Sequence, residues 1–106
     1  MNRSLERGIT AMTKTDYIYR YNLNRLRKEH GITYQKLSEL TGMDTFYLIK
    51  MHNYKSPAQP RWCFDRFEAF AAIYGVEVYE LFIPPKDIVY PDNLEPSCFI
   101  LFDENG

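Results

Sequence analysis

The chain contains few of the residues that build metal centres, disulfide frameworks or membrane spans. Its 106 residues include only two cysteines, Cys63 and Cys98, and two histidines, His30 and His52. These four residues do not stand at the spacing of a known zinc module, and nothing favours the oxidising compartment that a disulfide needs. We therefore expect two buried, unreactive thiols and no metal. No apolar run is long enough to cross a bilayer and no signal peptide is recognisable, which predicts a cytoplasmic protein without membrane contact.

The scarcity of histidine also argues against catalysis. A nucleophile needs a base and a group that orients the base, and neither histidine has an evident partner set of Asp with Ser or Cys. We therefore expect the chain not to be an enzyme and to need no cofactor.

Positive charge is not in excess over the whole chain, but it is unevenly distributed. The formal net charge is −1, and with 45% hydrophobic and 16% aromatic residues the chain can bury one modest core, which predicts one main domain. Residues 20–61 carry eight basic and three acidic side chains, a net charge of +5, whereas residues 62–106 carry two basic and nine acidic side chains, a net charge of −7. A basic half of this kind is the electrostatic footprint that DNA phosphates require.

Apolar residues at helical spacing predict five helices before residue 83. We expect them at about 16–29, 34–41, 45–53, 63–74 and, as a short last helix, 78–82. Thr15 is the expected N-cap of the first helix, whose apolar stripe leaves Arg20, Arg25 and Lys28 facing outward. For Arg20 and Arg25 an ordinary role as solvated helix charges is as plausible as a role in binding.

The predicted helices at 34–41 and 45–53 are joined by a short, tight turn. Thr33 and Asp44 are the expected N-caps, and Gly42 stands where the chain must bend, because only glycine enters positive φ without steric cost. Leu48 and Met51 form the expected buried side of the third helix. A helix held outward by another across a tight turn is the helix-turn-helix arrangement that fits the DNA major groove.

The same stretch resembles the Xre-type, Cro and phage-repressor-like helix-turn-helix family. The residues that carry the resemblance are Asn22, Leu26, Arg27, Gly31, Leu37, Ser38, Gly42, Met43, Asp44, Leu48, Met51, Asn53 and Lys55. The segment 64–82 resembles the closing helix pair of the family, with its Gly-Val step. The resemblance implies an all-α, five-helix, lambda-repressor-like helix-turn-helix domain at residues 15–82. It also implies a sequence-specific, repressor-like transcription regulator that binds double-stranded DNA as a homodimer.

The resemblance further implies which residues contact DNA. Base-facing positions are Thr45, Phe46, Ile49 and Lys50, of which Lys50 can donate to guanine. Phosphate contacts are expected from Tyr34, Gln35, Asn53, Tyr54 and Lys55. An equal alternative for Asn53 is that it caps the end of the helix.

Two departures from the family pattern keep a second function open. His52 stands where many members have a Glu that pairs with the arginine of helix one, here Arg27. Phe46 and Ile49 replace the usual polar readers, and such an apolar face also suits a protein partner. The alternative is therefore a protein-interaction module on the same fold, such as an antirepressor or an inhibitor of another protein.

The ends of the chain differ from this domain. Residues 1–14 lack a sustained apolar period and predict a flexible arm. Residues 83–106 form a tail interrupted by prolines at 84, 85, 91 and 96. Within that tail an apolar run predicts a strand at about 97–103, which would pair with Val89–Tyr90 or with the same strand of a second subunit.

Overall fold

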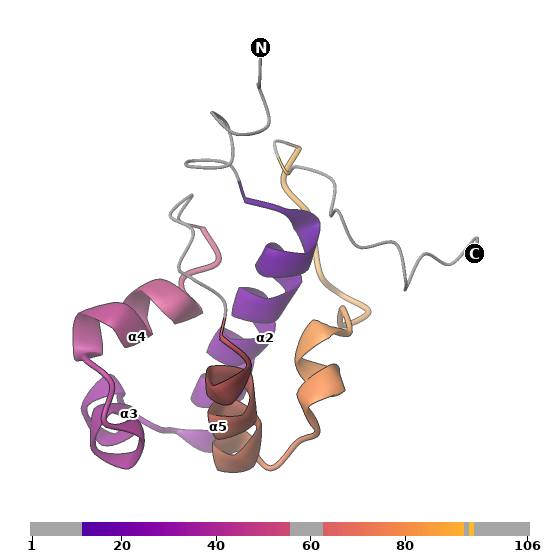
Figure 1. The fold of residues 1–106 in the computed structure, drawn as a ribbon. Coiled ribbons are helices and arrows are strands. Elements are labelled where there is room, and N and C mark those ends of the chain that lie inside the picture. The colour runs from indigo at the N-terminus through magenta and orange to yellow at the C-terminus, as the bar shows by residue number, and fades with distance from the viewer. Residues whose placement is uncertain (1–11, 56–62, 93, 95–106) are drawn as a thin grey trace.

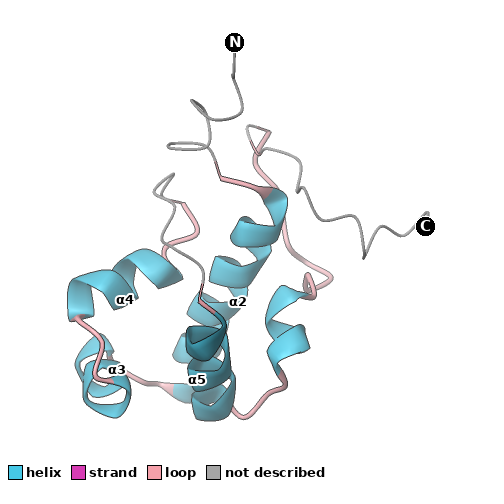
Figure 2. Cartoon of the chain, in the orientation of Figure 1, coloured by secondary structure: helices cyan, strands magenta, loops and turns pink. Residues whose placement is uncertain are grey.

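Helices make up the regular structure of the part of the chain that is described. The structure is a computed structural model, and it describes residues 12–55, 63–92 and 94. Its elements are α2 (Lys14–His30), α3 (Tyr34–Thr41), α4 (Thr45–His52), α5 (Phe64–Tyr74) and the 3-10 helix η1 (Val78–Phe82). Figure 2 shows these helices joined by loops, with no strand among the described residues. The predicted all-α class is therefore confirmed for the described residues.

α2 begins two residues before the predicted start. Its N-cap is Thr13, whose hydroxyl accepts the Asp16 amide at 3.1 Å, so the prediction that Thr15 caps this helix was wrong. Lys14, which was assigned to a flexible arm, is already helical, and residues 1–11 of that arm lie outside the described residues. Gly31 ends the helix with a φ of 65°.

The α3–turn–α4 unit follows the predicted bounds closely. Thr33 accepts the Lys36 amide at 3.1 Å, and Gly42 ends α3 with a φ of 75°. Asp44 then caps α4 by accepting the Phe46 amide at 2.9 Å. α4 ends at His52, one residue earlier than predicted, because Asn53 leaves the helix as its C-cap. Local capping chemistry therefore accounts for both helices and for the three-residue turn between them.

The core gathers around α2, which lies in the middle of the molecule with α3 and α4 on one side and η1 on the other (Figure 1). Leu48 and Met51 of α4 are fully buried, as predicted. The core side chains are Tyr19, Leu23, Leu26, Leu37, Leu48, Met51, Phe67, Phe70, Ala71, Tyr74 and Leu81. Burying the apolar side of α4 here leaves its other side toward solvent.

The segment after η1 runs back along α2. The Asn22 side chain donates to the carbonyls of Leu81 at 2.8 Å and Ile83 at 3.0 Å, and the Tyr17 hydroxyl donates to the Val89 carbonyl at 2.8 Å. Val89 and Tyr90, one predicted partner for a strand, thus lie against α2. The predicted strand at 97–103 lies outside the described residues, as does Cys98, whereas Cys63 is half-buried at the start of α5.

Candidate nucleic-acid interface

The outward side of α4 carries the four residues predicted to face DNA bases. Phe46 is 74% exposed and Ile49 is 42% exposed, which is unusual for side chains of this size. Lys50 is exposed as well, and Thr45 is half-buried. Because Leu48 is fixed in the core on the opposite side, these four residues form one accessible helical face. Whether that face contacts bases stays a prediction.

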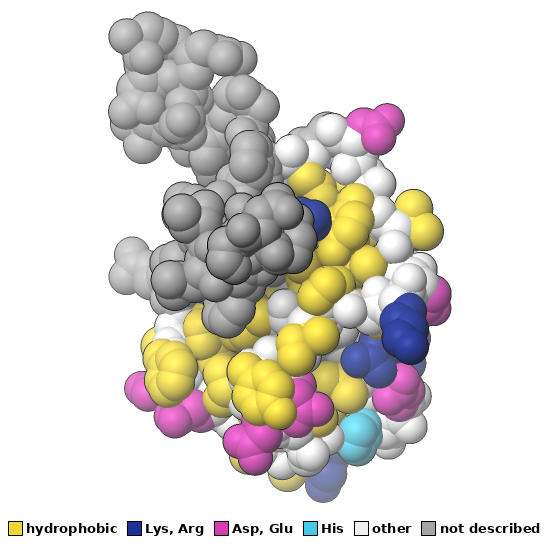
Figure 3. Space-filling model, turned by 90° about the vertical axis from the view of Figure 1, so that its right-hand side faces the viewer, with side chains coloured by type: hydrophobic (Ala, Val, Ile, Leu, Met, Phe, Trp, Pro, Cys, Tyr) yellow, Lys and Arg dark blue, Asp and Glu magenta, His cyan; other side chains and the backbone are white. Residues whose placement is uncertain are grey.

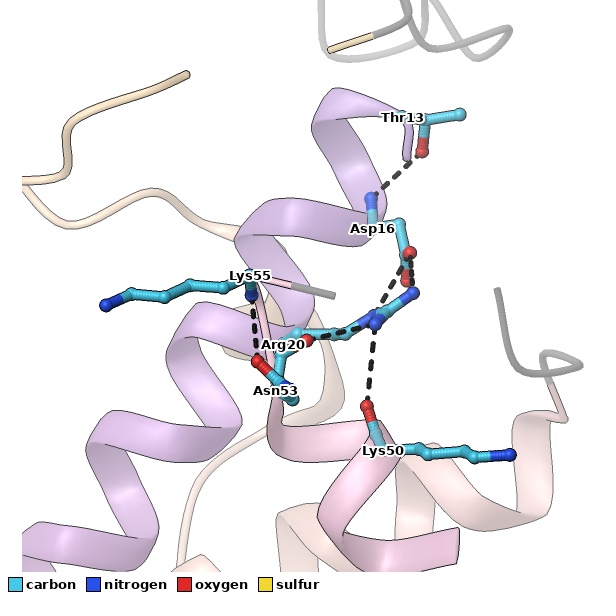
Figure 4. A network of polar contacts seen from close by, with 6 residues as sticks. All are labelled: Thr13, Asp16, Arg20, Lys50, Asn53 and Lys55. Atoms are coloured by element: carbon cyan, nitrogen blue, oxygen red, sulfur yellow. Dashed lines mark hydrogen bonds and ion pairs between the residues drawn. The ribbon is translucent and has the colours of Figure 1, made fainter. Parts of the chain in front are cut away.

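Arg20 is buried, although the sequence predicted that it faces solvent. Its exposed fraction is 0%, and its Nη2 and Nε groups donate to one carboxylate oxygen of Asp16 at 2.7 and 3.1 Å. Its Nη1 group donates to the carbonyls of Asn53 at 3.0 Å and Lys50 at 3.5 Å (Figure 4). Arg20 therefore connects α2 to the C-terminal end of α4. The only sequence signal was the acidic residue one helical turn earlier, Asp16.

Asn53 has a structural role at the end of α4. Besides the carbonyl that Arg20 contacts, its side-chain oxygen accepts the Lys55 amide at 3.0 Å. These contacts support the capping alternative, while the exposed side chain keeps a phosphate contact possible. In Figure 4 the side chains of Lys50 and Lys55 extend to opposite sides of this network.

Tyr34, which was predicted to contact phosphate, is half-buried. The Arg27 guanidinium lies 4.1 Å from the ring centroid and donates to the Ile32 carbonyl at 2.7 Å. Tyr34 thus partners Arg27 through a cation–π contact. Gln35, at the start of α3, is exposed.

Tyr54 packs against α2. Its ring centroid lies 4.9 Å from that of Tyr21 and 5.6 Å from that of Tyr17. Lys55 lies 5.9 Å from the Tyr54 ring and is exposed. Of these two predicted phosphate contacts, Lys55 is the more accessible.

His52 is a buried, neutral histidine under α4. Its Nδ1 lies 2.8 Å from the Leu48 carbonyl and its Nε2 lies 2.9 Å from the Tyr74 hydroxyl. A carbonyl can only accept, so Nδ1 carries the proton and Nε2 accepts from Tyr74. Burial lowers the pKa of His52 to about 4, and the nearby charge of Arg27 adds to this lowering, against the opposing effect of the Leu48 carbonyl. Burial likewise raises the pKa of the Tyr74 hydroxyl.

The basic half of the chain offers fewer accessible cations than its composition suggests. Arg20 is buried, and Arg25 pairs with Glu29 at 2.9 Å. Lys28, Lys50 and Lys55 are exposed and form no ion pair within the described residues. The face on the side of η1 is different, because hydrophobic side chains gather there next to carboxylates (Figure 3). Lys50 and Lys55 are thus the exposed cations on α4 and on the segment that follows it, and Asp44 is an exposed carboxylate at its start.

The described residues contain neither a membrane-spanning helix nor a metal-binding cluster. No helix among them is long and apolar enough to cross a membrane. No cluster of three or more His, Cys, Asp or Glu side chains among them could hold a metal ion.

Searches against protein-family models, curated proteins and solved structures find no match for this chain. A functional assignment therefore has to come from the residues and contacts given above.

Proposed function

We propose that this protein is a sequence-specific, repressor-like DNA-binding regulator with a lambda-repressor-like helix-turn-helix domain that places α4 in the major groove. The observation that carries the proposal is the outward face of α4, an accessible surface on a short helix whose opposite side is fixed in the core. α3 supports that helix across a three-residue turn, which is the relation that groove-reading helices require.

The chemistry of the face indicates how it would read DNA. Lys50 can donate to the O6 or N7 atoms of guanine, which contributes about 1–3 kcal/mol of discrimination. Phe46, Ile49 and the methyl group of Thr45 suit the methyl group of thymine. Gln35, Asn53 and Lys55, all exposed, are the most accessible of the predicted phosphate contacts. Apolar contacts discriminate less than paired hydrogen bonds, so we expect modest specificity.

Selection of bound duplexes from a random library tests the proposal directly. We expect enrichment of a short motif, and an affinity that falls linearly with the logarithm of salt concentration as phosphate contacts are lost. Recovery of sequences no different from the starting library, with no salt dependence, would refute it.

We further propose that the regulator acts as a homodimer on two half-sites, in the cytoplasmic compartment that contains its DNA. The two half-site contacts of a dimer share one association cost, so a dimer on two half-sites binds more tightly than a monomer on one. The predicted strand at 97–103 lies outside the described residues and is the sequence feature that favours this state. Light scattering at micromolar concentration tests it.

One observation favours a second candidate function. Besides Phe46 and Ile49, Leu40 of α3 is 53% exposed, so the α3–α4 unit presents three large apolar side chains to solvent. Such a surface suits a protein partner as well as a groove, and in that case the chain is an interaction module such as an antirepressor. The DNA selection separates the two functions, because an interaction module would enrich no motif.

A further inference from the structure

α4 ends differently from the other α-helices that the structure describes. α2, α3 and α5 each end at a glycine with positive φ, which closes the helix locally. α4 ends instead at Asn53, whose φ of −97° and ψ of 93° are those of extended backbone. This end therefore lacks the glycine cap of the other three helices, although the Asn53 amide donates to the Lys50 carbonyl at 3.3 Å. A carbonyl oxygen has two lone pairs, so the Lys50 and Asn53 carbonyls can each accept a further donor.

Arg20 of α2 supplies a further donor to both carbonyls. Its Nη1 group reaches the Asn53 and Lys50 carbonyls, where the helix dipole leaves partial negative charge. Arg20 is also the bulkiest fully buried side chain among the described residues, and burying a guanidinium is costly unless its charge is compensated. Asp16 provides that compensation through two donors of the same guanidinium.

We infer that Arg20 is a positioning residue, which together with Asp16 sets the C-terminal end of α4 and thereby the placement of Lys50 and Lys55 on DNA. The Lys50 carbonyl is itself a contact of Arg20, and the Lys55 amide is held by Asn53, whose carbonyl Arg20 also contacts (Figure 4). The inference rests on the proposed function for its link to DNA. The anchoring of α4 does not depend on that function.

Arg20→Lys is the sharpest test variant. Lysine keeps the positive charge beside Asp16 but lacks the planar fork, so it cannot bond the carboxylate and both carbonyls together. Asp16→Asn combined with Arg20→Met is the second variant, because it removes the pair without leaving a buried charge alone. Arg25→Lys and Arg25→Met are matched controls, since Arg25 lies on the same helix in an exposed pair with Glu29.

Two measurements on the full chain decide the inference. Amide hydrogen exchange in the free protein should be about tenfold faster at Asn53 and Lys55 in both test variants, and unchanged at the Phe70 amide in α5. Affinity for the selected duplex should fall about tenfold in the same variants, while the Arg25 controls stay within about twofold of the unaltered chain.

The possible failures are distinguishable. Unchanged exchange at Asn53 and Lys55 would overturn the anchoring of α4 by Arg20. Faster exchange with unchanged DNA affinity would overturn the positioning role. If the unaltered chain selects no DNA, both the proposed function and the role of Arg20 in DNA binding are refuted. The hydrogen-exchange measurement then still tests whether Arg20 anchors α4.

Discussion

Acidification should destabilise this protein through His52. In the unfolded chain the imidazole takes up a proton near its ordinary pKa of 6.5, whereas in the folded protein burial keeps its pKa at about 4. Stability from this group is therefore fully present above about pH 6.5 and is lost as the pH falls toward about 4. This difference between the unfolded-state and folded-state pKa of His52 lowers the free energy of unfolding by about 3 kcal/mol at acidic pH. That is a large part of the stability of a small domain.

Urea unfolding followed by circular dichroism, from about pH 7 to about pH 4.5, measures this loss. His52→Gln is the control, because an amide can donate to the Leu48 carbonyl and accept from the Tyr74 hydroxyl but does not titrate. The carboxylates are common to both proteins, so the difference between their pH profiles isolates His52. Identical profiles for the two proteins would refute the assignment of His52 as a buried neutral base.

Three further predictions concern the proposed interface and assembly. Lys55→Ala should weaken binding to all sequences about equally and lower the salt slope by about one, whereas Lys50→Ala should relax preference at one base position. Equal effects of both on selected and random duplexes would contradict the base contact. Phe46→Ala with Ile49→Ala should reduce DNA affinity at a stability cost under about 1 kcal/mol, because both side chains are exposed. A large drop in the melting temperature would show that they are packed. Deletion of residues 97–106 should give a monomer that keeps its helices but binds the selected duplex more weakly. This prediction is refuted if light scattering shows that the full-length chain is itself a monomer.

The helices could be predicted from the sequence because their signals are local. Thr33, Gly42 and Asp44 act within four residues of themselves, so the bounds of α3 and the start of α4 follow from the chain alone. Where two local signals compete, the sequence does not choose between them. Thr15 was predicted to cap α2, but Thr13, two residues earlier, has the same hydroxyl and is the cap in the structure.

The periodicity of α4 likewise predicted which of its sides is buried. Leu48 and Met51 are in the core and Phe46 is exposed, because side chains three and four residues apart share a helix face. The sequence thus predicted which side of α4 is exposed. What that surface binds depends on a partner, and the DNA-contact assignments remain predictions.

Tertiary structure alone decided the polar interior. Arg20 was expected at the surface because it falls outside the apolar stripe of α2. The structure buries it because the Asn53 carbonyl, 33 residues further along the chain, accepts from its guanidinium. His52 was noted only because it stands where a glutamate partner of Arg27 was expected. In the structure its Nε2 accepts from the Tyr74 hydroxyl, 22 residues away. Helical periodicity specifies a face and not the groups packed against it. A buried ion pair or histidine becomes stable only when distant segments bring the compensating donors and acceptors together.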